Sequence, residues 1–137
     1  MKVDKSNKIL WQQVNGYFQN PVNQEIFLSE IPSYLDLQIA GLSALAEYSL
    51  IASPQNPVYA IFKYDWYKLA KDNSIKDLIE PVQTESNIKL QIWNYSPGLW
   101  THKNIVDKYS LYLSLKDDHD ERVEQALEDM LEEELNG

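Results

Sequence analysis

The sequence predicts a single α+β domain over residues 1–137, in which helices pack on a small mixed or antiparallel sheet. The run VYAIF, residues 58–62, consists mainly of β-branched and aromatic residues and follows a cluster of turn residues, which is typical of a strand. The segment NIKLQIWNY, residues 87–95, alternates apolar and polar side chains, as a half-buried strand does. Residues 118–135 instead repeat their apolar positions with the period of a helix.

The first elements of the chain are expected to be a helix and a short strand. A helix is predicted over residues 6–20, with Ser6 as its N-cap and Pro21 directly after its last residue. Residues 25–29 are rich in strand formers, so we predict a strand there.

Two more helices are expected in the middle of the chain. One begins at Ser33 or Asp36, runs to about Tyr48 and ends before a cluster of turn residues. The other is short and covers residues 64–72, directly after the VYAIF strand.

Residues 107–115 fit two kinds of secondary structure, a strand and a helix. Their alternation of polar and apolar residues favours a strand. An N-cap at Asp107, with Leu111 and Leu115 four residues apart, favours a helix, and we expect the helix.

The last element is a long, acidic, amphipathic helix from Asp118 to Leu135. Asp118 and Glu121 resemble a capping box, with Asp in place of the usual Ser or Thr. One face of this helix is apolar, and it consists of Val123, Ala126, Leu127, Met130, Leu131 and Leu135.

The net charge of −9 is concentrated at the C-terminus. Residues 117–137 hold ten acidic residues and one arginine, whereas the rest of the chain holds eleven acids and eleven lysines. A DNA-binding surface normally needs a basic stripe that neutralises phosphates, and this sequence has none. We therefore expect no direct nucleic acid binding by this chain.

The composition also predicts a cytoplasmic protein without membrane contact. No apolar run approaches the roughly 18 residues of a membrane span, and the N-terminus has no signal-peptide pattern. The absence of cysteine excludes disulfides and thiolate catalysis.

Gly41-Leu42-Ser43-Ala44-Leu45 resembles most of a G-x-S-x-G nucleophile elbow, which would make Ser43 a catalytic nucleophile. The motif ends in Leu45 where an elbow needs glycine, and the preceding residues make a poor buried strand. A nucleophile also needs a base, and the sequence has only His102 and His119. We therefore predict a helix whose small residues allow a close neighbour, and no catalytic residue.

No cofactor or metal site is expected. The acidic run at residues 117–121 lacks the glycine with which a calcium loop bends, and acids at a helix N-terminus are favoured by the helix dipole alone. The four glycines are not clustered, so no nucleotide-binding fingerprint is present.

Five aromatic residues crowd one stretch of the chain. Core packing explains them, but an interaction surface also does, because Trp and Tyr are enriched at binding hot spots. The candidate surface, for a protein partner or for self-association, consists of Trp93, Tyr95, Trp100, Tyr109 and Tyr112.

Two stretches within residues 37–135 carry a resemblance to a known family. AGLSALAEYSLIASPQNPVYAI resembles the effector half of abortive-infection E-type antitoxins and related bacterial transcriptional regulators. QIWNYSPGLW, with the following VDKYSLYLSL and DERVEQAL, is similar to the tail of winged-helix regulators. The resemblance is one of packing and capping residues, not of a catalytic signature.

The resemblance implies a regulatory or interaction domain of a bacterial, antitoxin-like regulator. Such proteins carry a winged-helix domain upstream, whereas this sequence has KILWQQVNGYF at residues 8–18 and lacks a basic recognition helix. The chain is thus either a C-terminal domain by itself or a stand-alone relative. We expect a non-enzymatic interaction domain; the alternative is an enzyme or small-molecule-binding domain whose site this sequence does not reveal.

Overall fold

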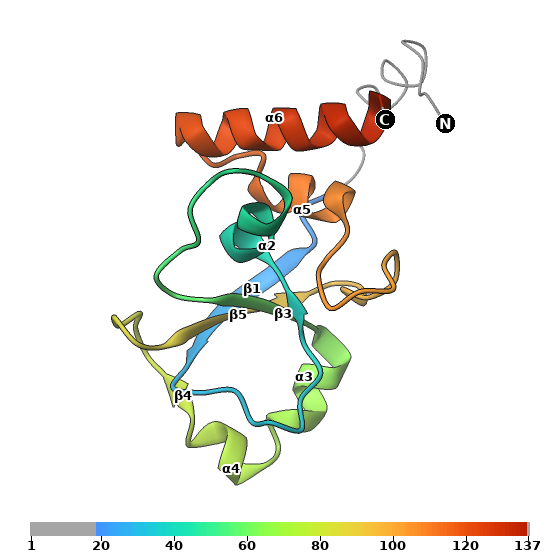
Figure 1. Ribbon diagram of the computed structural model, residues 1–137. Helices are drawn as coiled ribbons and strands as arrows, with labels where there is room; N and C mark the ends of the chain where they lie inside the picture. Colours follow the sequence, from blue (N-terminus) through green and yellow to red (C-terminus); the bar gives the residue numbers. More distant parts are fainter. Residues whose placement is uncertain (1–18, 137) are drawn as a thin grey trace.

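A computed structural model describes residues 19–136, which form a five-stranded mixed sheet between two groups of helices (Figure 1). The α+β class is confirmed. The strand order is β2-β3-β5-β1-β4. The strands are β1 (Val22–Leu28), β2 (Gln38–Ile39), β3 (Val58–Phe62), β4 (Ile79–Glu80) and β5 (Ile88–Trp93). The helices are α2 (Gly41–Tyr48), α3 (Lys63–Leu69), α4 (Asn73–Lys76), α5 (Lys108–Leu115) and α6 (Glu121–Asn136).

The centre of the sheet is a parallel pair, β3 and β5, in which Ala60 lies opposite Gln91. β1 runs antiparallel to β5 on its other side, with Ile26 opposite Leu90. Because both faces of the central pair are covered by helices, β3 is apolar along nearly its whole length. The predicted strands at residues 58–62 and 87–95 are thereby confirmed, apart from the ends of the second.

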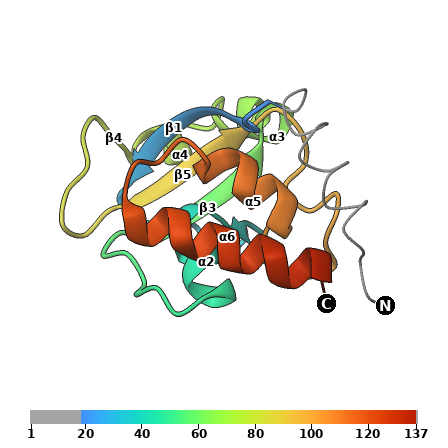
Figure 2. The ribbon, with the colours of Figure 1, turned by 90° about the horizontal axis from the view of Figure 1, so that it is seen from above.

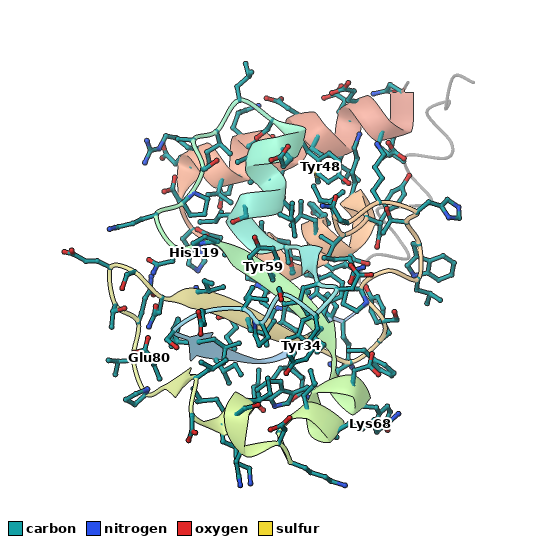
Figure 3. The ribbon with its side chains drawn as sticks, turned by 60° about the horizontal axis from the view of Figure 1, so that its bottom comes forward. Tyr34, Tyr48, Tyr59, Lys68, Glu80 and His119 are labelled. Carbon is teal, nitrogen blue, oxygen red and sulfur yellow. The ribbon has the colours of Figure 1, made fainter. Side chains whose placement is uncertain are left out.

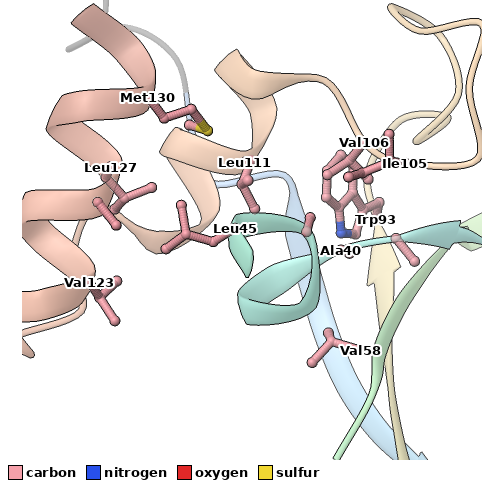
Figure 4. Close-up of a cluster of buried hydrophobic side chains, with 13 residues drawn as sticks. Ala40, Leu45, Val58, Trp93, Ile105, Val106, Leu111, Val123, Leu127 and Met130 are labelled. Atoms are coloured by element: carbon pink, nitrogen blue, oxygen red, sulfur yellow. The ribbon is translucent and has the colours of Figure 1, made fainter. Parts of the chain in front are cut away.

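Each face of the sheet has its own hydrophobic core. On one face α2, α5 and α6 cover a cluster that includes Leu45, Val58, Trp93, Leu111, Leu127 and Met130 (Figure 4). On the other face, α3, α4 and the loop after β1 cover a cluster formed by Leu28, Leu37, Ile61, Trp66, Ile75, Leu90 and Ile92. The sheet is therefore the middle of three layers.

The C-terminal helix α6 lies over α5 and α2 as the outermost element of its layer (Figure 2). Its apolar face is buried against this domain, as its periodicity predicts, with Leu131 only half-buried. All seven acidic residues of the helix are exposed. The burial of this face fixes α6 in place, although its charges repel one another.

The expected start of the helix ending at Tyr48 is wrong. The helix begins at Gly41, and Gln38 and Ile39 form β2 instead. Backbone hydrogen bonds explain the difference, because Ile39 donates to Asn104 and accepts from Val106. Residues far along the chain thus hold this segment extended, and local sequence does not reveal them.

The predicted capping box of the last helix is also wrong. The helix begins at Glu121, and the Asp120 carboxylate accepts a hydrogen bond of 2.8 Å from Arg122 N–H, as an N-cap does. Asp118 instead accepts from Asp120 N–H in the preceding turn. By contrast, the helix predicted at residues 107–115 is confirmed as α5, with Asp107 as its N-cap.

The other predicted elements differ less from the structure. The short helix expected at 64–72 is α3, and the strand expected at 25–29 is the longer β1. The short elements β4 and α4 were not expected from the sequence. The helix predicted at 6–20 lies mainly outside the described residues.

Candidate functional site

An open cleft of about 880 Å³ lies where the segment after β5 meets the first turn of α5. We call it the aromatic cleft. Among the described residues, it is lined by Gln19, Asn20, Pro21, Lys63, Asn94, Tyr95, Leu99, Trp100, Asp107, Lys108, Tyr109, Ser110, Leu113 and Glu134. Its size is within the usual range for ligand-binding clefts of roughly 300–1,000 Å³.

The segment 94–107 presents the exposed apolar side chains of this cleft. Its first residue donates a hydrogen bond from Asn94 N–H to the carbonyl of Pro21, and its end pairs with β2 through Ile105. Between these anchors, turns place Leu99 and Trp100 in solvent, with 58% and 69% of their surfaces exposed. Contiguous exposed apolar side chains are a feature of binding surfaces, and here they lie at the edge of a cleft.

A chain of polar contacts, which starts in the core, positions the wall of the cleft. Trp93 is 0% exposed, and its indole N–H donates to the Gln91 side chain at 3.0 Å. Gln91 in turn donates to the Glu25 carboxylate at 3.0 Å. The fixed Trp93 ring packs edge-on against Tyr95, with 5.6 Å between the ring centroids. The sheet thus orients a tyrosine that lines the cleft.

Asp107 is the polar feature that sets this cleft apart. One carboxylate oxygen, Oδ2, accepts a hydrogen bond of 2.9 Å from Ser110 N–H and caps α5. The other, Oδ1, is shielded from solvent and accepts no hydrogen bond from any described residue. A buried carboxylate oxygen without a donor is costly, so it favours a positive charge nearby.

Burial, together with the charge of Asp107, raises the pKa of two tyrosines around this carboxylate. Burial raises the pKa of Tyr95, its hydrogen bond to the Ser110 hydroxyl lowers it, and Asp107 raises it. Burial also raises the pKa of Tyr109, and the charges of Glu134 and Asp107 raise it further. The charge of Asp107 therefore acts on both tyrosines in addition to their burial.

The two lysines that line the cleft interact with groups other than Asp107. Lys108 Nζ lies 3.3 Å from a Glu134 carboxylate oxygen and 5.2 Å from the centre of the Tyr48 ring. Figure 3 shows Tyr48, whose hydroxyl donates to the carbonyl of Val106 at 2.9 Å. Lys63 Nζ lies over the Tyr64 ring. Neither lysine forms an ion pair with Asp107.

The structure separates the five aromatic residues that the sequence singled out. Tyr95, Trp100 and Tyr109 line the aromatic cleft together. Trp93 is not a surface residue, because it lies in the core, and this part of the prediction is wrong. Tyr112 is half-buried against the same core and does not line the cleft. The sequence identified Asp107 only as a cap and missed the contribution of Leu99 altogether.

Ser43 has a structural partner. Its hydroxyl oxygen accepts a hydrogen bond from Val58 N–H, and both histidines, His102 and His119, are exposed in loops. Figure 3 shows His119 in the loop before α6. Within residues 19–136, no group of three or more histidine or acidic side chains is arranged to hold a metal ion.

The fold and the cleft define an α+β domain with an exposed aromatic cleft. The chain matches no protein-family model, no curated protein and no solved structure in the three comparisons. In the part of the chain that the structure describes, no helix is both long enough and apolar enough to cross a lipid bilayer.

Proposed function

We propose that this chain is a non-enzymatic protein-interaction domain of a cytoplasmic, bacterial antitoxin-like regulator, and that the aromatic cleft is where its partner binds. The observation that carries the proposal is the exposure of Trp100 and Leu99 beside the half-buried Tyr95 and Tyr109. Large aromatic side chains that gather around a hollow are the residues on which binding energy concentrates in protein interfaces.

The resemblance to regulators and the net charge of the sequence also support the proposal. The segment that resembles winged-helix regulators, from Gln91 onward, contributes most of the cleft, including Tyr95, Trp100 and Tyr109. The charge of −9 adds to this, because the exposed acids of α6 reach the cleft at Glu134. A partner with a basic surface would be attracted to this side of the domain.

A photo-cross-linking experiment in cells tests the proposal. p-Benzoylphenylalanine replaces Trp100 in one strain and Tyr34 in another. Tyr34 is a suitable control because it is 65% exposed and belongs to the loop after β1, on the α3 side of the sheet (Figure 3). We expect a discrete cross-linked protein from position 100 that is absent from position 34.

Binding of the identified protein is then measured with purified components. Trp100→Ala should weaken its affinity at least about tenfold, which is typical of a hot-spot residue, while Tyr34→Ala leaves it unchanged. Both side chains are exposed, so neither change should unfold the domain. Equal cross-linking at the two positions, or binding that is insensitive to Trp100→Ala, would contradict the proposed site.

A small-molecule-binding domain is the second candidate, and the volume of the cleft favours it. The two functions differ in what copurifies with the chain. A metabolite released by denaturation of the parent protein but absent from the Trp100→Ala protein would favour this alternative.

A further inference from the structure

The aromatic cleft combines features that select a positively charged group. Tyr95, Trp100 and Tyr109 line it, and the faces of aromatic rings attract cations. Asp107 lies in the same wall with an oxygen that no described donor satisfies. This oxygen is shielded from solvent, so water screens it less than it would screen the oxygens of a surface carboxylate.

We infer that the aromatic cleft binds a lysine or arginine side chain of the partner, with its aliphatic stem against Trp100 and its charge facing Asp107 and Glu134. This inference rests on the proposed function and adds the chemistry of the partner. The cationic group need not touch Asp107 Oδ1, because the attraction acts through the low-dielectric wall of the cleft. The charge of Asp107, which adds to the effect of burial on the pKa of Tyr95 and of Tyr109, also attracts a cation.

Two further clefts among the described residues lack these features. The cleft between the end of α2 and α6, of about 700 Å³, is lined by three acids and Arg122 but by no tryptophan. The cleft beside β1, of about 550 Å³, is lined by three acids and Lys89 and by no aromatic ring. The aromatic cleft itself contains two lysines, so it is set apart by Trp100 and by an Asp107 oxygen that no described donor satisfies, and not by its number of acids.

A peptide titration on the full chain tests the inference even before the partner is identified. The chain has four tryptophans, so labelling them with nitrogen-15 gives four indole signals in an NMR spectrum. The signal that disappears in Trp100→Phe belongs to Trp100. The probes are the pentapeptide acetyl-Leu-Gly-Lys-Gly-Leu-amide and its analogue with norleucine in place of lysine, at equal ionic strength.

We expect a saturable shift of the Trp100 signal with the lysine peptide, and binding at least about tenfold weaker with the norleucine peptide. Asp107→Asn should reduce the affinity for the lysine peptide by a similar factor. Asparagine caps helices as well as aspartate does, so this variant removes the charge and keeps the cap of α5. The matched control, Asp36→Asn, changes an exposed acid outside the cleft and should bind as the parent does.

Glu134→Gln is the second variant, because Glu134 is an exposed cleft residue whose change should leave the fold intact. It should weaken binding of the lysine peptide less than Asp107→Asn does, because Glu134 already faces Lys108. Equal binding of the two peptides, or a Trp100 shift that Asp107→Asn leaves unchanged, would overturn the inference. Concentration-dependent shifts of the protein alone would also overturn it, since the occupant would then be a second copy of the chain.

The outcomes distinguish this inference from the proposed function. If the cross-linked partner binds through Trp100 but neither peptide discriminates by charge, the proposed function stands and the inference fails. If no partner cross-links at position 100 while the lysine peptide binds, the cation site stands without the proposed function.

Discussion

The hydroxyl oxygen of Ser43 accepts a 2.9 Å hydrogen bond from the backbone N–H of Val58, and so joins the first turn of α2 to the first residue of β3. The carbonyl of Val58 accepts in turn from Ala40 N–H, at 2.9 Å. Both main-chain groups of Val58 are thus satisfied by the segment that opens α2. Ser43 holds the strand, and this contact explains its place in the G-x-S motif without catalysis.

Ser43→Ala should destabilise the protein by about 1–3 kcal/mol, because it leaves the partly buried N–H of Val58 without an acceptor. Had the hydroxyl bonded only within its own helix, the cost would be below about 1 kcal/mol. Ser114→Ala is the matched control, since the Ser114 hydroxyl donates to Leu111 in the same helix. Urea denaturation of both variants gives the comparison. Equal costs would contradict a role for Ser43 in holding β3.

Gly41→Ala should lower the free energy of unfolding by more than approximately 1–2 kcal/mol. That is the cost of a left-handed backbone conformation for a residue with a side chain, and Gly41 has a φ of 54°. Its close contact with Val58 adds to this cost. A methyl group there would meet Val58 Cγ1 at 2.8 Å. Gly98→Ala is the control, since a methyl group there would meet only the end of the Gln38 side chain, at 3.3 Å. In thermal melts, the melting temperature of Gly41→Ala should be well below that of Gly98→Ala. The opposite order would show that α2 can move away from β3.

Leu127→Ala should lower the free energy of unfolding by about 2–5 kcal/mol, as a truncation in a packed core does. Leu127 lies in the cluster that α6 forms with α2 and α5 (Figure 4). Leu131→Ala provides a graded comparison on the same helix, because Leu131 is only half-buried, and it should cost less. Chemical denaturation measures both. A Leu127→Ala protein as stable as the parent would mean that α6 does not contribute to the core.

Moderate salt should raise the melting temperature, because it screens repulsion among the exposed acids of α6. Glu124, Glu128 and Glu132 are spaced four residues apart, and each like-charge pair at this spacing costs roughly a few tenths of a kcal/mol. Glu128→Gln removes two of these pairs and should melt higher than the parent at low salt, with the difference shrinking as salt is added. A melting temperature that does not change with salt would contradict this account.

Stability should fall at alkaline pH, in part through Tyr48. Burial raises the pKa of Tyr48 above its ordinary value, and the charges of Asp107 and Glu134 raise it further. Since the folded pKa is the higher one, the contribution of Tyr48 is fully present below about pH 10, the ordinary pKa of tyrosine, and is lost as the pH rises through the folded value.

The Tyr48→Phe variant should therefore lose less stability than the parent when the pH rises above about 10. The variant also lacks the hydrogen bond to Val106, so the slopes of unfolding free energy against pH are compared, not the absolute values. Below about pH 9, where tyrosine is neutral in both states, the two slopes should coincide. Identical slopes at high pH would contradict the assignment.

The sequence by itself determined those elements whose apolar pattern requires burial, whatever segment they are buried against. The apolar run of β3 requires cover on both faces, and the apolar stripe of α6 requires a core, so both could be identified without knowing what covers them. The side chain of Asp107 bonds within its own turn, so the start of α5 was also readable.

Only the tertiary structure decided where distant segments meet. Gln38 and Ile39 form a strand because Asn104 and Val106 hold Ile39 extended, although the surrounding sequence suits a helix. The aromatic cleft depends on the same kind of contact. Tyr95 and Trp93 are two residues apart and both aromatic, yet Trp93 turns into the core, where Gln91 bonds its indole, while Tyr95 lines the cleft. Local composition cannot separate them, because their burial is set by the sheet and helices packed around them.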